Sequence, residues 1–251
     1  MADAHHPRPH RLSRLPAWFT RWLGYRASPP PKLPDWLIWL WTWIAAFCGI
    51  SVIQAVFTYS HYFVERGAPT IVASYGASAV LIYGAVDAPL AQPRALMGGH
   101  FIGALTGVII TKLVHLVPTE ERYLELQWLA GSLACATAIV IMQITSTTHP
   151  PAGATALLAA VNADVRHLGW YYLPIILLTS TLALAVALVM NNIQRRYPVF
   201  WFQPAVSIPA KPSPDLGGPE PKDADGTKGI GPSSVSVSSS EDVAKVGTSP
   251  V

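Results

Sequence analysis

The chain alternates between long apolar runs and short polar breaks. Four runs are nearly free of charge, and each has about the 20 residues that a helix needs to cross a bilayer; they cover 36–59, 96–117, 127–146 and 170–192. Two shorter apolar runs, 69–86 and the run after Pro151, are broken by small residues or proline. The pattern predicts an all-α, polytopic transmembrane protein with four long spans and two short segments, each a broken or half-helix.

The clearest break in the pattern lies around His149-Pro150-Pro151. Two adjacent prolines remove two backbone donors and disfavour helix in the residue before them, so a short helix should begin near Gly153 and run to about Ala163. Its roughly 11 residues would cover about 16 Å, or half of a hydrocarbon core of about 30 Å. The N-terminal end of this half-helix would lie near the middle of the membrane.

The same device occurs earlier in the chain, at a constant offset. Residues 76–81, Gly-Ala-Ser-Ala-Val-Leu, match 153–158, Gly-Ala-Thr-Ala-Leu-Leu, after a shift of 77 residues, and the same shift places Asp87 on Asp164. Long apolar runs flank both copies in the same order. We therefore expect two repeats, at about 36–117 and 127–192.

The short segments leave the number of crossings open between four and six. In either case the two ends of the chain lie on the same side. The connection 118–125 carries three glutamates against one arginine and suits the non-cytosolic side, while Arg94 suits the cytosolic side. Both placements hold only with six crossings, so we expect six, with the repeats inverted as in many transporters.

Composition agrees with a membrane protein and separates three regions. Of the 251 residues, 51% are hydrophobic and only 12% are charged, which is about half the usual charge content. A basic, proline-rich arm (1–32) precedes a transmembrane domain (33–196), and a tail rich in Pro, Ser and Gly (197–251) follows it. Arginines outside the first and last spans place both ends in the cytosol, or in the matrix of an organelle. We expect the tail to be disordered, with its serine run at 233–240 a candidate for phosphorylation.

Polar residues inside the apolar region are few and are therefore informative. We expect a substrate pathway between the half-helices, with Gly76 and Gly153 at their N-termini, because free N–H groups and a positive dipole end favour anions there. The pathway residues that we predict are Ser74, Ser78, Arg94, His100, His149 and Thr155, with Arg94 and His100 at its mouth or gate. Simple packing of small residues explains either serine equally well, and His149 could instead brace the broken turn. Lys112 and His115 are interpreted as snorkelling residues.

Other chemistries find little support in the sequence. None of His61, His100, His115, His149 and His167 pairs at the i, i+4 spacing typical of zinc sites. There is no Gly-x-Ser-x-Gly, no phosphate-cradling loop and no nucleic-acid motif. We therefore expect no metal, no cofactor, no nucleic-acid partner and no enzyme activity. The expected partners are the lipid bilayer and a small anion, and small-residue faces are compatible with a homo-oligomer.

Three blocks of sequence, in order, resemble the HPP integral membrane family. They are Ala73-Ser74-Tyr75-Gly76-Ala77-Ser78-Ala79-Val80-Leu81, then Pro89-Leu90-Ala91-Gln92-Pro93-Arg94 with Gly98-Gly99-His100, and His149-Pro150-Pro151-Ala152-Gly153-Ala154-Thr155-Ala156. The basic lead 21–26 is similar to fungal members. The family is usually described with about four spans, against the six that we expect. Plant plastid members are described as nitrite transporters, and some bacterial members carry a nucleotide-sensing CBS region, which this chain lacks.

The residues and the resemblance together predict a transporter or channel for a small inorganic anion, with nitrite or nitrate favoured. A dipole end and an imidazole can hold a small monovalent anion without the several basic residues that a phosphate would need. Two other classes stay open: a sensing or structural membrane protein without transport activity, and a membrane enzyme.

Overall fold

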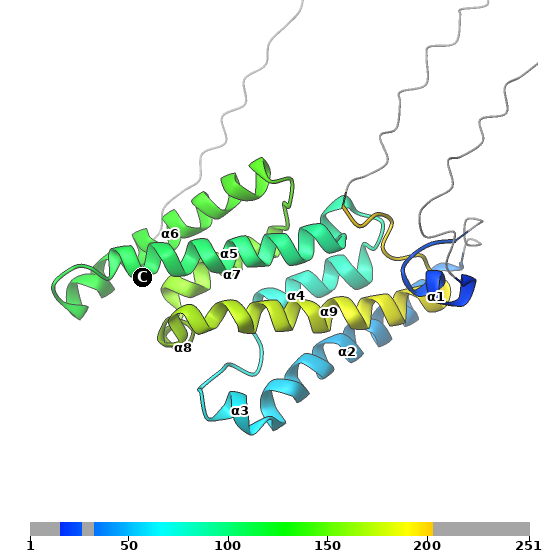
Figure 1. Cartoon of the computed structure of the whole chain (residues 1–251), viewed down its shortest axis with the longest axis horizontal. Helices are drawn as coiled ribbons and strands as arrows, with labels where there is room; N and C mark the ends of the chain where they lie inside the picture. The colour runs from blue at the N-terminus through cyan, green and yellow to red at the C-terminus, as the bar shows by residue number, and fades with distance from the viewer. Residues whose placement is uncertain (1–15, 27–32, 203–251) are drawn as a thin grey trace, which may run out of the picture. The chain divides into compact units, whose positions relative to one another are not determined.

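The computed structural model describes residues 16–26 and 33–202, and its regular structure within these ranges is entirely helical (Figure 1). Most of the basic arm, the tail after residue 202 and the serine run lie outside the described residues. The helices are α1 (Ala17–Trp22), α2 (Asp35–Tyr59), α3 (His61–Val64), α4 (Ser74–Ala79), α5 (Pro93–Val114), α6 (Glu120–Ile144), α7 (Pro150–Val161), α8 (Ala163–Leu168) and α9 (Tyr172–Gln194). A π-helical turn, Val80–Gly84, continues α4, and 3-10 turns occupy Pro89–Ala91 and Gly169–Tyr171.

Four helical stretches are long and apolar enough to cross a membrane, as the sequence predicts. They are Asp35–Tyr59, Pro93–Val114, Glu120–Ile144 and Ala163–Gln194. The outward faces of α2 and α6 are covered by large apolar side chains: Trp39 and Trp43 on α2 are 69% and 66% exposed, and Trp128 on α6 is 67% exposed. Because water would not favour such faces, they are the surfaces that meet lipid.

The two short helices also belong to segments that connect opposite ends of the bundle. One end, here called the α1 end, holds α1, the start of α5, and the C-terminal ends of α6 and α9; the other, the α8 end, holds α3, α8 and the loop between α5 and α6 (Figure 1). The chain leaves α2 at the α8 end and reaches the start of α5 at the α1 end through α4. It leaves α6 at the α1 end and reaches α8 through α7. The half formed by α2, α4 and α5 therefore runs in the opposite direction to the half formed by α6, α7 and α9 (Figure 1).

Helix α7 begins three residues earlier than we expected, at Pro150. Both prolines occupy the first turn, where a missing N–H costs nothing and the fixed φ suits a helix. His149 precedes them in extended conformation (φ −137°, ψ 102°) and forms the N-cap. Gly153 is thus the fourth residue of the helix, and α7 ends at Val161.

The first short helix follows an irregular approach. Residues 68–73 are not helical, and α4 begins at Ser74, so Gly76 is its third residue. The π-helical turn that follows leaves carbonyl groups without their usual partners. The Asn191 amide donates to the Ile82 carbonyl (2.8 Å), and Arg195 donates to the Tyr83 carbonyl (2.9 Å). The end of α9 thereby holds the end of the short helix in place.

Helix α5 forms the centre of the bundle and packs against α6, α7 and α9. Gly99, Gly103 and Gly107, spaced by four residues, face α7 and the turn before it. A Cβ atom at Gly99 would lie 2.6 Å from the Cβ of His149, and one at Gly107 would lie 2.6 Å from the Ala156 carbonyl oxygen. The two helices are therefore close enough for their backbones to touch, which brings polar side chains on α5 against those on α7.

Candidate functional site

Five of the six predicted pathway residues form one hydrogen-bonded network at the junction of α4, α5 and α7. The network consists of Ser74, Ser78, His100, His149 and Thr155. Ser74 is 3% exposed and the other four side chains are fully buried. Buried polar groups normally need partners because an unpaired one costs about 1–3 kcal/mol, and here each group has at least one.

His100 lies at the centre and is held from both sides by the two repeats. Its Nε2 lies 2.7 Å from the Ser78 hydroxyl of α4, and its Nδ1 lies 2.8 Å from the Thr155 hydroxyl of α7. Ser78 and Thr155 are the residues that the 77-residue shift superimposes. Each of the two matching hydroxyl groups thus hydrogen-bonds one nitrogen of the His100 ring.

His149 extends the network towards the α1 end. Its Nε2 lies 2.9 Å from the Ser78 hydroxyl, and its Nδ1 lies 2.8 Å from the Leu90 carbonyl oxygen. The two imidazole rings meet edge to face, with their centroids 4.9 Å apart. The structure therefore joins two histidines that are 49 positions apart in the sequence through one serine.

For neutral rings, the partners determine the direction of every bond in the chain. The Leu90 carbonyl can only accept, so His149 carries its proton on Nδ1 and accepts from Ser78 at Nε2. Ser78 has then used its proton, so His100 donates to it from Nε2 and accepts from Thr155 at Nδ1. Ser74 completes the series by donating to Thr155 over 2.8 Å. All five bonds point one way, from Ser74 to Leu90.

A second arrangement of the same side chains accepts one extra proton. If His149 becomes doubly protonated, both of its nitrogens donate, and the Ser78 hydroxyl must turn away from it. The Ser74 carbonyl lies 3.3 Å from that hydroxyl and can receive it. In that arrangement the Ser78 hydroxyl donates to the Ser74 carbonyl and accepts from both imidazole rings.

Several backbone N–H groups at the starts of α4 and α7 are absent or already bonded within the chain. The first two residues of α7 are prolines and have no N–H, and the Ala152 N–H already bonds to the His149 carbonyl (2.8 Å). At α4 the Tyr75 and Gly76 N–H groups bond to the Val72 and Ala73 carbonyls. The donors at this site are therefore hydroxyl and imidazole groups.

Arg94 does not join the network, although it lies only six positions before His100. It is half-buried at the α1 end, where it donates to the Phe202 carbonyl (2.9 Å) and the Thr145 carbonyl (2.5 Å). We expected Arg94 and His100 at the mouth or gate of the pathway, and the structure buries the His100 side chain fully inside the bundle.

The contacts of two tyrosines and of a row of glycines on α5 were not predicted from the sequence. The Tyr75 ring stacks on His100, with centroids 4.2 Å apart and planes within 11°. The Tyr172 hydroxyl donates to the Thr155 carbonyl (3.3 Å). The signal for the row of glycines is visible in the sequence, because Gly99, Gly103 and Gly107 recur every fourth residue; the tyrosines carry no such signal.

The fold and the buried network define a multi-pass integral membrane protein built around a polar core. The model of the family "HPP, transmembrane region" matches residues 31–198, and the chain belongs to this family. Two relatives from Dictyostelium discoideum, both named transmembrane proteins, are 37% and 40% identical to it over 190 residues. The match covers 74% of this chain and 63% and 57% of those relatives. No solved structure matches the chain.

Proposed function

We propose that this protein is a membrane transporter or channel for a small inorganic anion, with nitrite and nitrate as the first ions to test, and that it is not an enzyme. The observation that carries the proposal is that the hydroxyl groups of Ser78 and Thr155, which occupy matching positions in two halves of opposite direction, both hydrogen-bond the His100 ring. Inverted repeats with a polar site at their junction are the common architecture of secondary transporters. The resemblance to plant members described as nitrite transporters supports the choice of ions.

The geometry also favours movement of a proton with the anion. A continuous series of hydrogen bonds with two protonation states can pass a proton between its members, and imidazole is the side chain best suited to do so near neutral pH. Because all five side chains are buried, an ion reaches them only when α4 or α7 shifts against α5. We therefore propose alternating access, in which protonation of His149 accompanies the movement.

The charge of the two ends supports an orientation. Among the described residues, the α1 end carries five arginines against two aspartates, whereas the α8 end carries four Lys and Arg residues against five Asp and Glu residues. Cytosolic ends carry the excess of Lys and Arg. We accordingly propose that the α1 end faces the cytosol, or the matrix in an organelle.

The test is nitrite uptake into proteoliposomes that contain the purified full chain, with and without an imposed pH gradient. The proposal predicts uptake that follows the gradient and falls at least about tenfold in His149→Ala, since that variant removes two buried hydrogen bonds at once. A melting temperature measured in detergent checks that the variant is folded. Wild-type flux no higher than that of empty liposomes, for nitrite, nitrate and chloride alike, would favour a sensing or structural protein.

A further inference from the structure

A second polar region lies at the α8 end, outside the buried network. A cavity of about 470 Å³ opens there, where the end of α5, the start of α6, α7 and α8 come together. Its polar lining consists of Thr111, Lys112, His115, Glu120, Arg166 and His167. We interpreted Lys112 and His115 as snorkelling residues; both line this cavity.

Two donors at this cavity are buried without hydrogen-bond partners among the described residues. They are the Thr111 hydroxyl, on a residue only 6% exposed, and the Nη1 of Arg166. Leaving a buried donor unpaired costs about 1–3 kcal/mol, and more when it is charged. Both residues line the cavity, so an acceptor that entered it from outside the chain would lie beside two donors that the chain itself leaves unpaired.

The fixed charges of the cavity favour an anion. Lys112 and Arg166 are cations, and the described structure includes no ion pair for Lys112, whose ammonium lies 5.9 Å from the centre of the Trp170 ring. Glu120 is the single carboxylate in the lining. A further acid, Asp164, lines a second cavity together with Arg66 and His167. Among the Lys, Arg, Asp and Glu residues of the lining there are two cations and one carboxylate, which leaves an excess of one positive charge.

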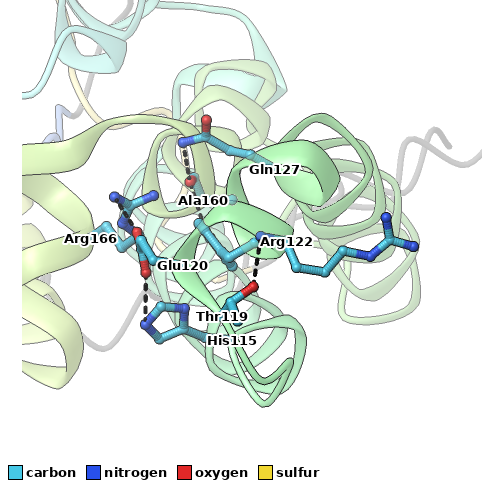
Figure 2. A network of polar contacts seen from close by, with 8 residues as sticks. His115, Thr119, Glu120, Arg122, Gln127, Ala160 and Arg166 are labelled. Carbon is cyan, nitrogen blue, oxygen red and sulfur yellow. Dashed lines mark hydrogen bonds and ion pairs between the residues drawn. The ribbon is translucent and has the colours of Figure 1, made fainter.

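Glu120 already neutralises part of the positive charge of the cavity. One of its oxygens lies 3.2 Å from Nη2 of Arg166, and the other lies 3.6 Å from Nε2 of His115 (Figure 2). The Tyr123 ring supports both partners, at 4.8 Å from the guanidinium carbon and 4.8 Å from the His115 ring centroid. Arg166 is thus held by a carboxylate on one side while its Nη1 stays unpaired.

We propose that this cavity binds a small oxyanion of the nitrite and nitrate class, before or after its passage through the bundle. Arg166 and Thr111 donate hydrogen bonds to its oxygens, and Lys112 neutralises its charge. The free Nη1 of Arg166 supplies one charge-assisted hydrogen bond to an oxygen of the anion, while Nη2 stays with Glu120. The volume leaves room for water around the ion. The inference rests on the proposed function for the class of ion.

The role of Glu120 gives the proposal an unusual signature. As a resident carboxylate it competes with the anion for Arg166 and repels it. Removing the positive charge of Arg166 must therefore weaken binding, while removing the negative charge of Glu120 must strengthen it. A purely structural ion pair predicts that both changes leave the affinity unaltered.

The experiment titrates nitrite into the purified full chain in detergent, at constant ionic strength, and follows the rise in melting temperature, from which an apparent Kd is obtained. We expect Arg166→Gln to raise the Kd at least about tenfold and Lys112→Gln to raise it several-fold, since charged hydrogen bonds are the stronger ones. Glu120→Gln should lower it about threefold or more.

Arg122→Gln is the matched control. Arg122 lies on the same helix as Glu120, pairs with Glu125 at 2.6 Å, and has a side chain that is 61% exposed. It is not among the residues that line the cavity, and its side chain points away from Arg166 and His115 (Figure 2). Arg122→Gln removes one positive charge, as Arg166→Gln does. Because exposed ion pairs contribute only about 0–1 kcal/mol, the Kd of Arg122→Gln for nitrite should stay within about twofold of the wild-type value. Equal Kd values for Arg122→Gln, Arg166→Gln and Glu120→Gln would overturn the proposal.

A lipid phosphate offers the same chemistry, and a second arm separates it. The titration is repeated in nanodiscs with and without phosphatidylglycerol. If the lipid raises the melting temperature in the wild type but not in Arg166→Gln, and nitrite does nothing in either, the cavity is a lipid site and the inorganic-ion proposal is wrong.

The two proposals fail in different ways. Nitrite binding that depends on Arg166 in a protein without nitrite flux would leave the cavity assigned and reject transport. Flux with an unchanged half-saturating concentration in Arg166→Gln, together with unchanged binding, would reject the cavity and keep transport.

Discussion

The molecule has two polar regions of opposite character. The network around His100 is buried, carries no charge when its rings are neutral, and has a partner for every side chain. The cavity at the α8 end is open, positively charged, and has two donors without partners. A closed neutral chain of hydrogen bonds suits a proton, whereas an open charged cavity suits an anion. Under the proposed function, proton transfer and anion binding would be separated along the bundle.

The largest effect should come from breaking the network without changing its shape. Thr155→Val keeps the branched side chain but removes the hydroxyl that donates to His100, so a relay through His100 is interrupted. We expect proton-driven nitrite uptake to fall at least about tenfold, in line with the loss of a positioned proton-transfer group.

Thr155→Ser is the control for this prediction, because it restores the hydroxyl in a smaller side chain. Uptake in Thr155→Ser should stay within about threefold of the wild type. Equal losses in the two variants would mean that shape, and not proton transfer, is what Thr155 provides.

A second large effect should follow from separating the helices that carry the network. Gly107→Ala places a methyl group 2.6 Å from the Ala156 carbonyl oxygen of α7. Forcing α5 and α7 apart should cost about 1–3 kcal/mol, as overpacking does elsewhere, and lower the melting temperature in detergent.

Gly76→Ala is its matched control, because nothing lies within 4 Å of the added methyl group. Alanine also favours helix over glycine by up to about 1 kcal/mol. Its melting temperature should equal or exceed that of the wild type. A loss of stability in Gly76→Ala as large as in Gly107→Ala would show that close packing on α7 is not the cause.

Salt should have a smaller effect, and it should act on the cavity at the α8 end more than on the buried network. Long-range attraction of anions to the cavity is screened beyond about 10 Å at 0.1 M salt. Raising the ionic strength with a bulky anion that does not enter the cavity should raise the half-saturating nitrite concentration several-fold. The maximal uptake rate, set by the network, should change less than twofold. A salt-dependent maximal rate would contradict the division of tasks.

The smallest effect concerns orientation and leaves activity unchanged. Thr119→Cys, in the loop between α5 and α6, should react with a membrane-impermeant maleimide added to intact cells, in a background where Cys48 and Cys135 are replaced by alanine. Labelling only after the cells are opened would place the α8 end in the cytosol and reverse the proposed orientation.

The sequence predicted the helices far better than the bonds between them. Apolar runs located all four long helices because length and hydrophobicity decide membrane crossing. The prolines located α7, although its start was placed three residues late because proline is welcome in a first turn. The repeat offset paired Ser78 with Thr155. Nothing in the pattern indicated that both would bond the same ring, because that depends on how closely α5 approaches α7.

Residues of the second region were harder to recognise. Lys112 and Arg166 are 54 positions apart in the sequence, and each is an ordinary cation near a helix end when considered alone. Only the fold brings them to one cavity with Thr111, and only burial shows that a donor lacks a partner. Arg94 illustrates the converse, since its place in a conspicuous motif says nothing about the direction of its side chain, and it lies apart from the network.

The residues just after α9 hold the loop before α5 in place, and this contact has a mechanical consequence. The Leu90 carbonyl that sets the His149 ring lies next to Ala91, whose carbonyl receives the Tyr197 hydroxyl (2.7 Å), while the Val199 N–H donates to Gln92 (2.8 Å). A pull on the chain just beyond α9 is therefore transmitted to a deeply buried imidazole through a handful of bonds. A partner that binds or pulls on the segment with Tyr197 and Val199 would therefore act on the position of the His149 ring.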